Sequence, residues 1–171
     1  MALTAGLALA CEARSGGLKT IWLANKEDIT SFTLTGSLYS AVTMVVTKVF
    51  YKFEFEQDTA EVRESVSREN GSTSASHEVE FFTPKMSQVN RDAIQQIIDQ
   101  SNCGIVAIVE DANLNKWVVG YSETFTVDRG LKISSDEALS GKALTDLNGD
   151  TVIIASQDNE KMRTFTGTVP V

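Results

Sequence analysis

Few residues of this chain combine the types and spacing that catalysis needs. The single histidine, His77, stands where a polar segment meets a predicted strand. A catalytic histidine works with a nucleophile and an orienting carboxylate, and the sequence contains neither a GxSxG elbow nor a cysteine motif that would provide them. We therefore expect His77 to be a solvated loop residue, and we expect no enzymatic activity.

Oxygen ligands for a metal ion recur at every second position in Asp146, Asn148 and Asp150. This is the spacing of a calcium loop, but an EF-hand also needs a bidentate Glu at the last position of the loop. That position holds Gln157. A tight turn at Asn148-Gly149 is the simpler interpretation, and calcium binding is the alternative. Glycine-rich phosphate loops are also missing from the sequence, so we expect no cofactor and no metal.

The two cysteines, Cys11 and Cys103, have no metal-ligand or redox spacing. We expect two buried or partly buried free thiols, with a disulfide between them as the alternative, because one pair in a chain of this size is weak evidence of secretion. The apolar run from Leu3 to Ala10 lacks the preceding cations of a signal peptide. Residues 1–17 are therefore predicted to be an N-terminal arm that packs on a neighbouring subunit or on the domain surface, rather than a lipid anchor or a membrane span.

Length and charge indicate one globular domain, predicted over residues 18–171. The chain has 171 residues, of which 42% are hydrophobic and 22% charged, as in ordinary globular domains. Fifteen Lys and Arg against 23 Asp and Glu give a formal net charge of −8. A surface that grips nucleic acid needs clustered cations, so the composition argues against that class. It is compatible with a surface that nucleic acid slides past.

The longest predicted strand is a stretch in which apolar and charged residues alternate. From residue 42 to 56, apolar side chains favour odd positions and charged ones even positions, which predicts a strand with one apolar and one charged face. Such a strand would be roughly 50 Å long, whereas a globule of this size is about 40 Å across. With HEVEFF as its return limb, the stretch predicts a long β-hairpin over residues 41–82 that overhangs the domain. An overhang of this kind is expected of a subunit in an assembly.

The segment between the two predicted limbs contains Asn70-Gly71, the strongest hairpin-turn signal in the chain. The tip of the hairpin should therefore lie near residues 68–75. Its Ser, Thr, Glu, Asn and Gly residues favour mobility unless a partner holds them. We interpret the tip as an assembly loop, and an idle surface hairpin is the alternative.

One amphipathic helix is predicted over residues 85–101, after the entry signal Thr83-Pro84. Its apolar residues follow helical spacing: Met86, Val89, Ala93, Ile94, Ile97 and Ile98. Short β-branched runs on both sides of the helix predict eight or nine strands. The fold class is therefore α+β and mainly β, an antiparallel β-barrel or sandwich with one flanking amphipathic helix and a long β-hairpin.

Carboxylates cluster only on the two limbs of the predicted hairpin, where four of them share parity: Glu54, Glu56, Glu78 and Glu80. If both limbs belong to one sheet, these residues line one acidic surface. Such a surface would keep a passing polyanion from adhering at short range. The alternative is a solvated strand face, whose cross-strand repulsion is relieved by Lys48 and Lys52.

Two stretches carry a family resemblance, the hairpin AVTMVVTKVFYKFEFE…HEVEFF and the helix MSQVNRDAIQQIIDQS that follows it. In this order they resemble the tail tube proteins of long-tailed bacteriophages and, more distantly, the tube proteins of type VI secretion and contractile injection systems. GLKTIWLANKEDITSF and SGKALTDLNGDTVII are similar to stretches of phage virion structural proteins. The resemblance covers most of the chain and depends on architecture, without a diagnostic motif.

The resemblance implies a virion protein of the phage tail, assembled in the host cytoplasm. Its subunits would form hexameric rings that stack into a tube and contact other tail proteins. DNA would pass through the tube during genome ejection without specific binding, with Glu54, Glu56, Glu78 and Glu80 facing the lumen. The N-terminal arm and a loop would contact the adjacent ring or subunit, and the residues of that loop would be Arg63, Glu64, Arg68, Glu69 and Asn70.

Two other classes of protein are compatible with the sequence. Another virion component, such as a capsid decoration, neck-ring or baseplate protein, would share the acidic and β-rich composition. A secreted ligand-binding β-domain, anchored through a lipid on Cys11, is the second alternative. Micrographs of the purified protein distinguish the first from a tube subunit, and the mass of the N-terminal peptide tests the second.

Overall fold

The computed structural model describes residues 15–171, which form two β-sheets and one α-helix. The N-terminal arm predicted for residues 1–17, including Cys11, lies outside the described residues except for its last three. A seven-stranded sheet has the order β2 (Ile29–Thr35), β3 (Leu38–Met44), β11 (Arg163–Phe165), β8 (Lys116–Val119), β7 (Ile105–Asp111), β1 (Leu18–Asn25) and β4 (Tyr51–Phe53). A four-stranded sheet has the order β5 (Glu61–Glu69), β6 (Ser72–Pro84), β10 (Gly149–Asp158) and β9 (Lys132–Leu139). Neighbouring strands are antiparallel, apart from the parallel contact of β11 with β3.

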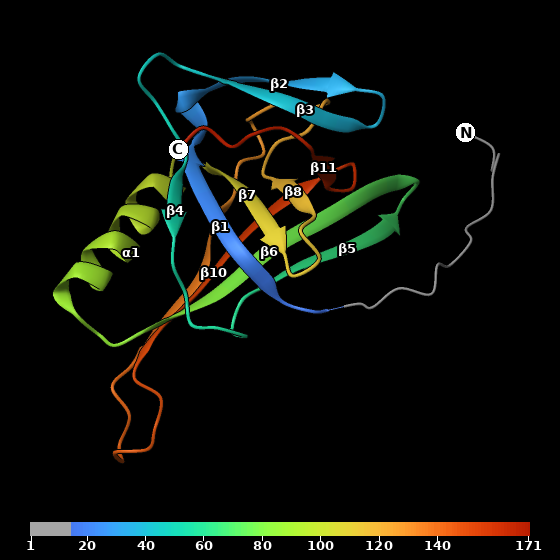
Figure 1. Cartoon of the computed structure of the whole chain (residues 1–171). Coiled ribbons are helices and arrows are strands. Elements are labelled where there is room, and N and C mark those ends of the chain that lie inside the picture. The colour runs from blue at the N-terminus through green and yellow to red at the C-terminus, as the bar shows by residue number, and fades with distance from the viewer. Residues whose placement is uncertain (1–14) are drawn as a thin grey trace.

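The two sheets form a sandwich with α1 (Gln88–Ser101) at one side (Figure 1). One core cluster lies between the sheets and under the helix, and includes Ile21, Val79, Ile97 and Ile154. The described residues form two separate sheets and not a closed barrel, so the sandwich is the correct one of the two architectures predicted. The mainly β, α+β class is confirmed.

A second core cluster covers the other face of the seven-stranded sheet. It is rich in aromatic side chains, with the ring centroids of Phe32 and Tyr39 5.2 Å apart. Strand β7 alternates between the two clusters: Ala107 and Val109 belong to the first, and Ile108 to the second. Since both faces of β7 are buried, its continuous apolar run is what a central strand requires.

Helix α1 begins at Gln88, three residues later than predicted. Pro84 still belongs to β6, and Lys85 has a positive φ of 66°, so the chain turns before the helix can start. The Ser87 side chain then accepts the backbone N–H of Asn90 at 3.2 Å, as an N-cap. Two of the predicted apolar positions, Ile94 and Ile97, are buried, whereas Val89 in the first turn is 78% exposed.

The prediction that residues 42–56 form one long strand is wrong. β3 ends at Met44, and the chain turns through Thr47, which has a φ of 71°. β4 then joins β1 at the far edge of the seven-stranded sheet. Val46 and Phe50 both occupy even positions, but Val46 is 85% exposed and Phe50 is 1% exposed. The alternation of exposed and buried residues is therefore not continuous across this turn.

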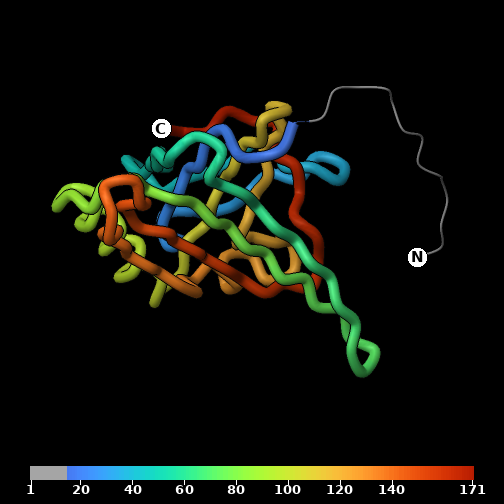
Figure 2. Tube along the Cα trace, turned by 90° about the horizontal axis from the view of Figure 1, so that it is seen from below, coloured from blue at the N-terminus to red at the C-terminus, as the bar shows by residue number. Residues whose placement is uncertain are grey.

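The long hairpin consists instead of β5 and β6, joined at Asn70-Gly71. Asn70 and Gly71 have φ angles of 50° and 82°, as a two-residue turn between twisted strands requires. The turn therefore lies where the sequence predicted it, with a different first limb. Its tip projects well beyond the body of the domain (Figure 2).

Candidate functional site

The four-stranded sheet has one buried face and one polar face. On β6 and β10, alternate residues such as Val79, Phe81, Val152 and Ile154 are at most 1% exposed and pack into the core between the sheets. The residues between them point the other way. That outer face carries two large apolar residues, Phe82 and Ile153, and otherwise small and polar side chains: Ser74, Ser76, Glu78, Glu80, Thr151, Ala155 and Gln157.

Both edges of this sheet are open in the part of the chain that the structure describes. β5 pairs only with β6, and β9 only with β10, within residues 15–171. Each neighbouring pair is antiparallel, so β5 and β9 run in opposite directions. An open strand edge presents unpaired N–H and C=O groups to which another strand can bind.

One guanidinium holds three carboxylates on the outer face. Arg63 of β5 lies opposite Glu78 of β6, and its Nη2 is 2.9 Å from Oε1 of that residue. Nη2 also contacts Glu80, and Nε is 3.1 Å from Oε1 of Glu61. Three carboxylates against one cation leave this cluster with a net charge of −2, so the outer face is acidic here.

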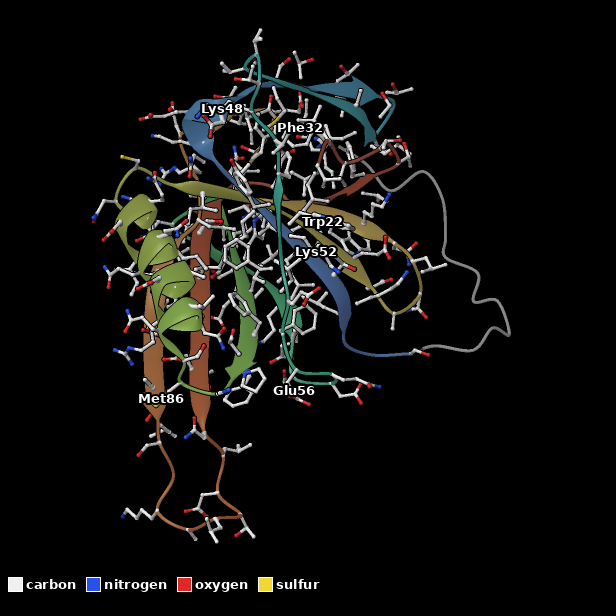
Figure 3. The ribbon with its side chains drawn as sticks, turned by 60° about the vertical axis from the view of Figure 1, so that its left-hand side comes forward. Trp22, Phe32, Lys48, Lys52, Glu56 and Met86 are labelled. Carbon is white, nitrogen blue, oxygen red and sulfur yellow. The ribbon has the colours of Figure 1, made fainter. Side chains whose placement is uncertain are left out.

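The four glutamates that were predicted to line one surface come from two different segments of the chain. Glu78 and Glu80 lie side by side on the outer face, as above. Glu54 follows β4 of the other sheet and pairs with Lys52, with Nζ and Oε1 3.3 Å apart. Glu56 donates its backbone N–H to the Phe82 carbonyl at 3.0 Å, beyond the end of the β5–β6 pairing; Figure 3 shows Glu56 and Lys52 along one segment. The prediction was wrong for Glu54, because it placed residues 42–56 on the first limb of the hairpin.

The five residues predicted for a contact loop also divide. Arg68, Glu69 and Asn70 are exposed at the tip of the β5–β6 hairpin. Arg63 belongs to the acidic cluster on the outer face. Glu64 points to the inner face, where its side chain is 16% exposed. Only the first three residues therefore lie at the tip where the contact loop was predicted.

A row of polar side chains crosses the inner face of the sheet near the base of the tip. Glu64, His77 and Ser156 are direct neighbours on β5, β6 and β10. His77 Nε2 lies 3.8 Å from Oε2 of Glu64. Glu64 Oε2 also accepts the backbone N–H of Met162 at 2.7 Å, and its Oε1 is 3.3 Å from Nζ of Lys161. Glu64 thus holds the segment after β10 against the hairpin.

The expectation that His77 is a solvated loop residue is wrong, because His77 is 4% exposed. Burial lowers its pKa, and the neighbouring carboxylates of Glu64 and Asp158 act in the opposite direction. His77 Nε2 and Ser156 Oγ have no hydrogen-bond partner among residues 15–171. Sequence parity contained the signal for this burial, since His77 shares odd positions with the core residues Val79 and Phe81.

This Glu–His–Ser row has the residue types of a catalytic triad but lacks access for a substrate. Ser156 is 9% exposed and His77 4%, and both face the interior of the sandwich. A nucleophile must reach the atom that it attacks. We therefore interpret the row as a buried polar contact that fixes the base of the hairpin.

The tight turn predicted at Asn148-Gly149 is not there: the chain turns at Leu144-Thr145, and Gly149 already belongs to β10. The side chains of this loop bind backbone groups. Asp146 Oδ2 accepts the N–H groups of Lys142 and Ala143, each at 2.8 Å. Asp150 is buried on β10, 2% exposed. In residues 15–171, His, Cys, Asp and Glu form no group of three or more that could hold a metal ion.

A groove of about 540 Å³ lies between α1 and β4, lined by apolar residues such as Leu23, Phe53 and Ile97. Its charged residues include Lys52 and Glu54, which pair with each other. Cys103, just after α1, is a free thiol, but it is exposed and not buried or partly buried as expected, because it lies in the turn that ends the helix. The helix itself is too short and too polar to cross a bilayer, as is any helical segment within residues 15–171.

Comparison of the chain with protein-family models, curated proteins and solved structures found no match.

Proposed function

We propose that this chain is a structural subunit of a bacteriophage tail tube, which assembles into rings that stack into a DNA-conducting channel. The observation that supports this most directly is the four-stranded sheet, with one face in the core, one polar face and two open edges of opposite direction. Such a sheet is incomplete by itself and complete in a ring. The hexameric ring number comes from the family that the sequence resembles.

The direction of the edge strands suits a closed ring. When identical subunits are related by rotation about an axis along the strands, β5 of one subunit meets β9 of the next. Because β5 and β9 run in opposite directions, this contact is antiparallel and continues the sheet without a break. Six copies would form one barrel of 24 strands, in which every edge is covered.

The outer face of the sheet would then line the channel. Its serines, threonine and glutamine are small or neutral, and its Arg63 cluster has an excess of carboxylates. Negative charge close to the DNA path repels phosphates within about one Debye length, ~8 Å at physiological ionic strength. A lumen of this chemistry lets DNA move without binding it, in agreement with the net charge of −8.

Electron microscopy of the purified chain tests the proposal at the level of the particle. We expect rings with a central channel, stacked into tubes at high protein concentration. A monomer at all concentrations, or an isolated trimer, would contradict the proposal. The trimer would favour a capsid decoration protein instead.

Disulfide trapping tests the edge contact itself. In a background with Cys11→Ser and Cys103→Ser, Glu61→Cys on β5 and Ser135→Cys on β9 place two thiols on the outer face, at opposite edges of the sheet and at the same level along the strands. Oxidation should link neighbours into a covalent ladder that ends at the ring number, and Arg63→Cys in place of Glu61→Cys covers a register shifted by two residues. Each single-cysteine variant is the control, since one thiol per chain cannot extend a ladder beyond a dimer. A double variant that remains monomeric on denaturing gels in both registers would rule out the β5–β9 contact.

A further inference from the structure

The loop between β9 and β10 exposes large apolar side chains at the end of the sheet opposite the hairpin tip. Leu139, Leu144 and Leu147 are 51%, 108% and 72% exposed; we call these three residues the leucine surface. Figures 1 and 2 both show this loop and the β5–β6 tip at opposite ends of the four-stranded sheet. Val89, in the first turn of α1, is also 78% exposed. It lies three residues after Met86, whose backbone N–H binds Asn148 of this loop.

The loop is held in place by specific hydrogen bonds. Asp146 Oδ2 accepts two backbone N–H groups, from Lys142 and Ala143, and these bonds lower the pKa of that carboxyl. Asn148 donates its side-chain amide to the Ser140 carbonyl at 3.1 Å and accepts the Met86 N–H at 2.9 Å. Figure 3 shows Met86 below the helix, beside this loop. A loop that is already ordered loses little conformational freedom when a partner binds.

The geometry points to the β5–β6 tip of a second copy of this chain, in the next ring, as the partner of the leucine surface. This inference rests on the proposed ring assembly. If the strands of the sheet run along the channel, the tip of one subunit extends toward the neighbouring ring at the end where that ring presents its β9–β10 loops. The two elements then meet once per subunit.

The chemistry of the two ends is compatible. The tip offers Val66, which is 48% exposed on the hairpin, as an apolar contact for the leucines. Arg68 and Glu69 flank the turn, and the loop carries Lys142 and Asp146, so each end has one cation and one anion. Contact would remove apolar side chains from water, which favours association.

Because the two surfaces differ, the contact is heterologous and leaves a free tip at one end of every stack and a free leucine surface at the other. An interface of this kind propagates without closing. It therefore explains how rings can form a tube of many layers with one pair of surfaces. A contact between identical surfaces would stop at two rings.

Two variants block the two surfaces separately. The loop variant carries Leu144→Ser and Leu147→Ser, and since both leucines are exposed, its folding should be unchanged. The tip variant lacks residues 66–69 and 72–75, so that Ser65 and Ser76, which are paired in the native hairpin, are joined by the native Asn70-Gly71 turn. Leu114→Ser is the matched control, because Leu114 is a 65% exposed leucine on the β7–β8 turn of the other sheet.

We expect the wild-type and Leu114→Ser chains to form tubes, and each blocked variant to stop at single rings in electron micrographs. When rings of the two variants are formed separately and mixed, the intact tip of the loop variant can bind the intact loop of the tip variant. The mixture should therefore contain stacks of two rings and no longer stacks.

Tubes formed by the loop variant alone would overturn the inference while leaving the proposed function intact. Single rings in the mixture would also overturn it, because the two surfaces would then not bind each other. Double rings of the tip variant alone would show that the leucine surface binds its own kind. A wild-type chain that forms no rings would contradict the proposed function itself, before stacking is tested.

Discussion

The central strands of the two sheets bury their side chains differently. In β7 of the seven-stranded sheet, Ile105 through Glu110 are all buried, because one core cluster lies on each face. In β6 of the four-stranded sheet, buried and half-buried residues alternate from Ser74 to Phe82. The first sheet has both faces inside the fold, whereas the second has only one.

This difference separates the parts of the chain that maintain the fold from those that remain for assembly. A strand covered on both faces has no surface to offer to a partner. The four-stranded sheet keeps a polar face, two open edges within residues 15–171, and a projecting hairpin. Substitutions in the two sheets should therefore have effects of different kinds, on stability in one and on assembly in the other.

Truncation of isoleucines in the two sheets should give the largest contrast in stability. Ile108 of β7 is fully buried, and Ile108→Ala should reduce the free energy of unfolding by about 2–5 kcal/mol, through lost apolar burial and a residual cavity. Ile153 is half-buried on the outer face of β10, and Ile153→Ala should cost markedly less. Urea denaturation of the two variants, in conditions that keep the chain monomeric, measures the difference.

Ile154→Ala provides the control on the same strand as Ile153. Ile154 is 0% exposed on the inner face, so its truncation should resemble that of Ile108. Equal losses for Ile153→Ala and Ile154→Ala in the monomer would show that the outer face is covered within the subunit. The distinction between the two sheets would then fail.

The sequence contained enough information for the parts of this contrast that depend on local patterns. The apolar run of β7 and the alternation of Val79 and Phe81 are both properties of neighbouring residues, and each predicts a strand with the burial that the structure shows. The helix and the Asn70-Gly71 turn were likewise predictable, since capping and turn residues act over a few positions. His77 was missed although its parity was visible, because a histidine was assumed to need solvent.

The first limb of the hairpin was not predictable by the same means. A local alternation shows that residues prefer a pleated surface, but not which strand they pair with. β4 pairs with β1, about thirty residues earlier in the chain, and the turn at Thr47 has neither Gly nor Pro to mark it. The error placed Glu54 on the hairpin, whereas this residue follows β4 of the other sheet.

The inner face of the four-stranded sheet should make stability depend on pH. Burial lowers the pKa of His77 below 6.5, against the opposing effect of nearby Glu64, Asp158 and Glu160. The unfolded chain therefore binds a proton at a higher pH than the folded chain does. As pH falls from 7 through 6.5 towards the folded pKa, stability should decrease, by at most about 1.4 kcal/mol per pH unit.

His77→Gln is the control for this effect, since glutamine does not titrate and His77 is the only histidine in the sequence. The difference in unfolding free energy between wild type and variant should change between pH 7 and 6. Only the wild type has a histidine that takes up a proton more readily in the unfolded chain than in the folded one. Denaturant midpoints at several pH values in this window measure it. Parallel pH profiles for the two chains would show that His77 keeps its ordinary pKa in the folded state.

The smallest effect on folding, and the clearest test of the outer face, should come from the glutamates. Glu78→Lys with Glu80→Lys changes the Arg63 cluster from a net charge of −2 to +2 on a face that does not contribute to the core. The subunit should fold and assemble, but DNA should leave particles containing this variant more slowly, because lysines in the channel would bind phosphates. Raising the salt concentration should partly restore the rate.

Glu27→Lys with Glu54→Lys changes the charge of the chain by the same amount at two exposed positions outside the four-stranded sheet. DNA release from particles with this second variant should match the wild type. If both pairs slow release equally, the lumen extends beyond the four-stranded sheet to the segments that carry Glu27 and Glu54. If neither does, the outer face does not line the channel, and the open edges of the sheet must serve a different assembly.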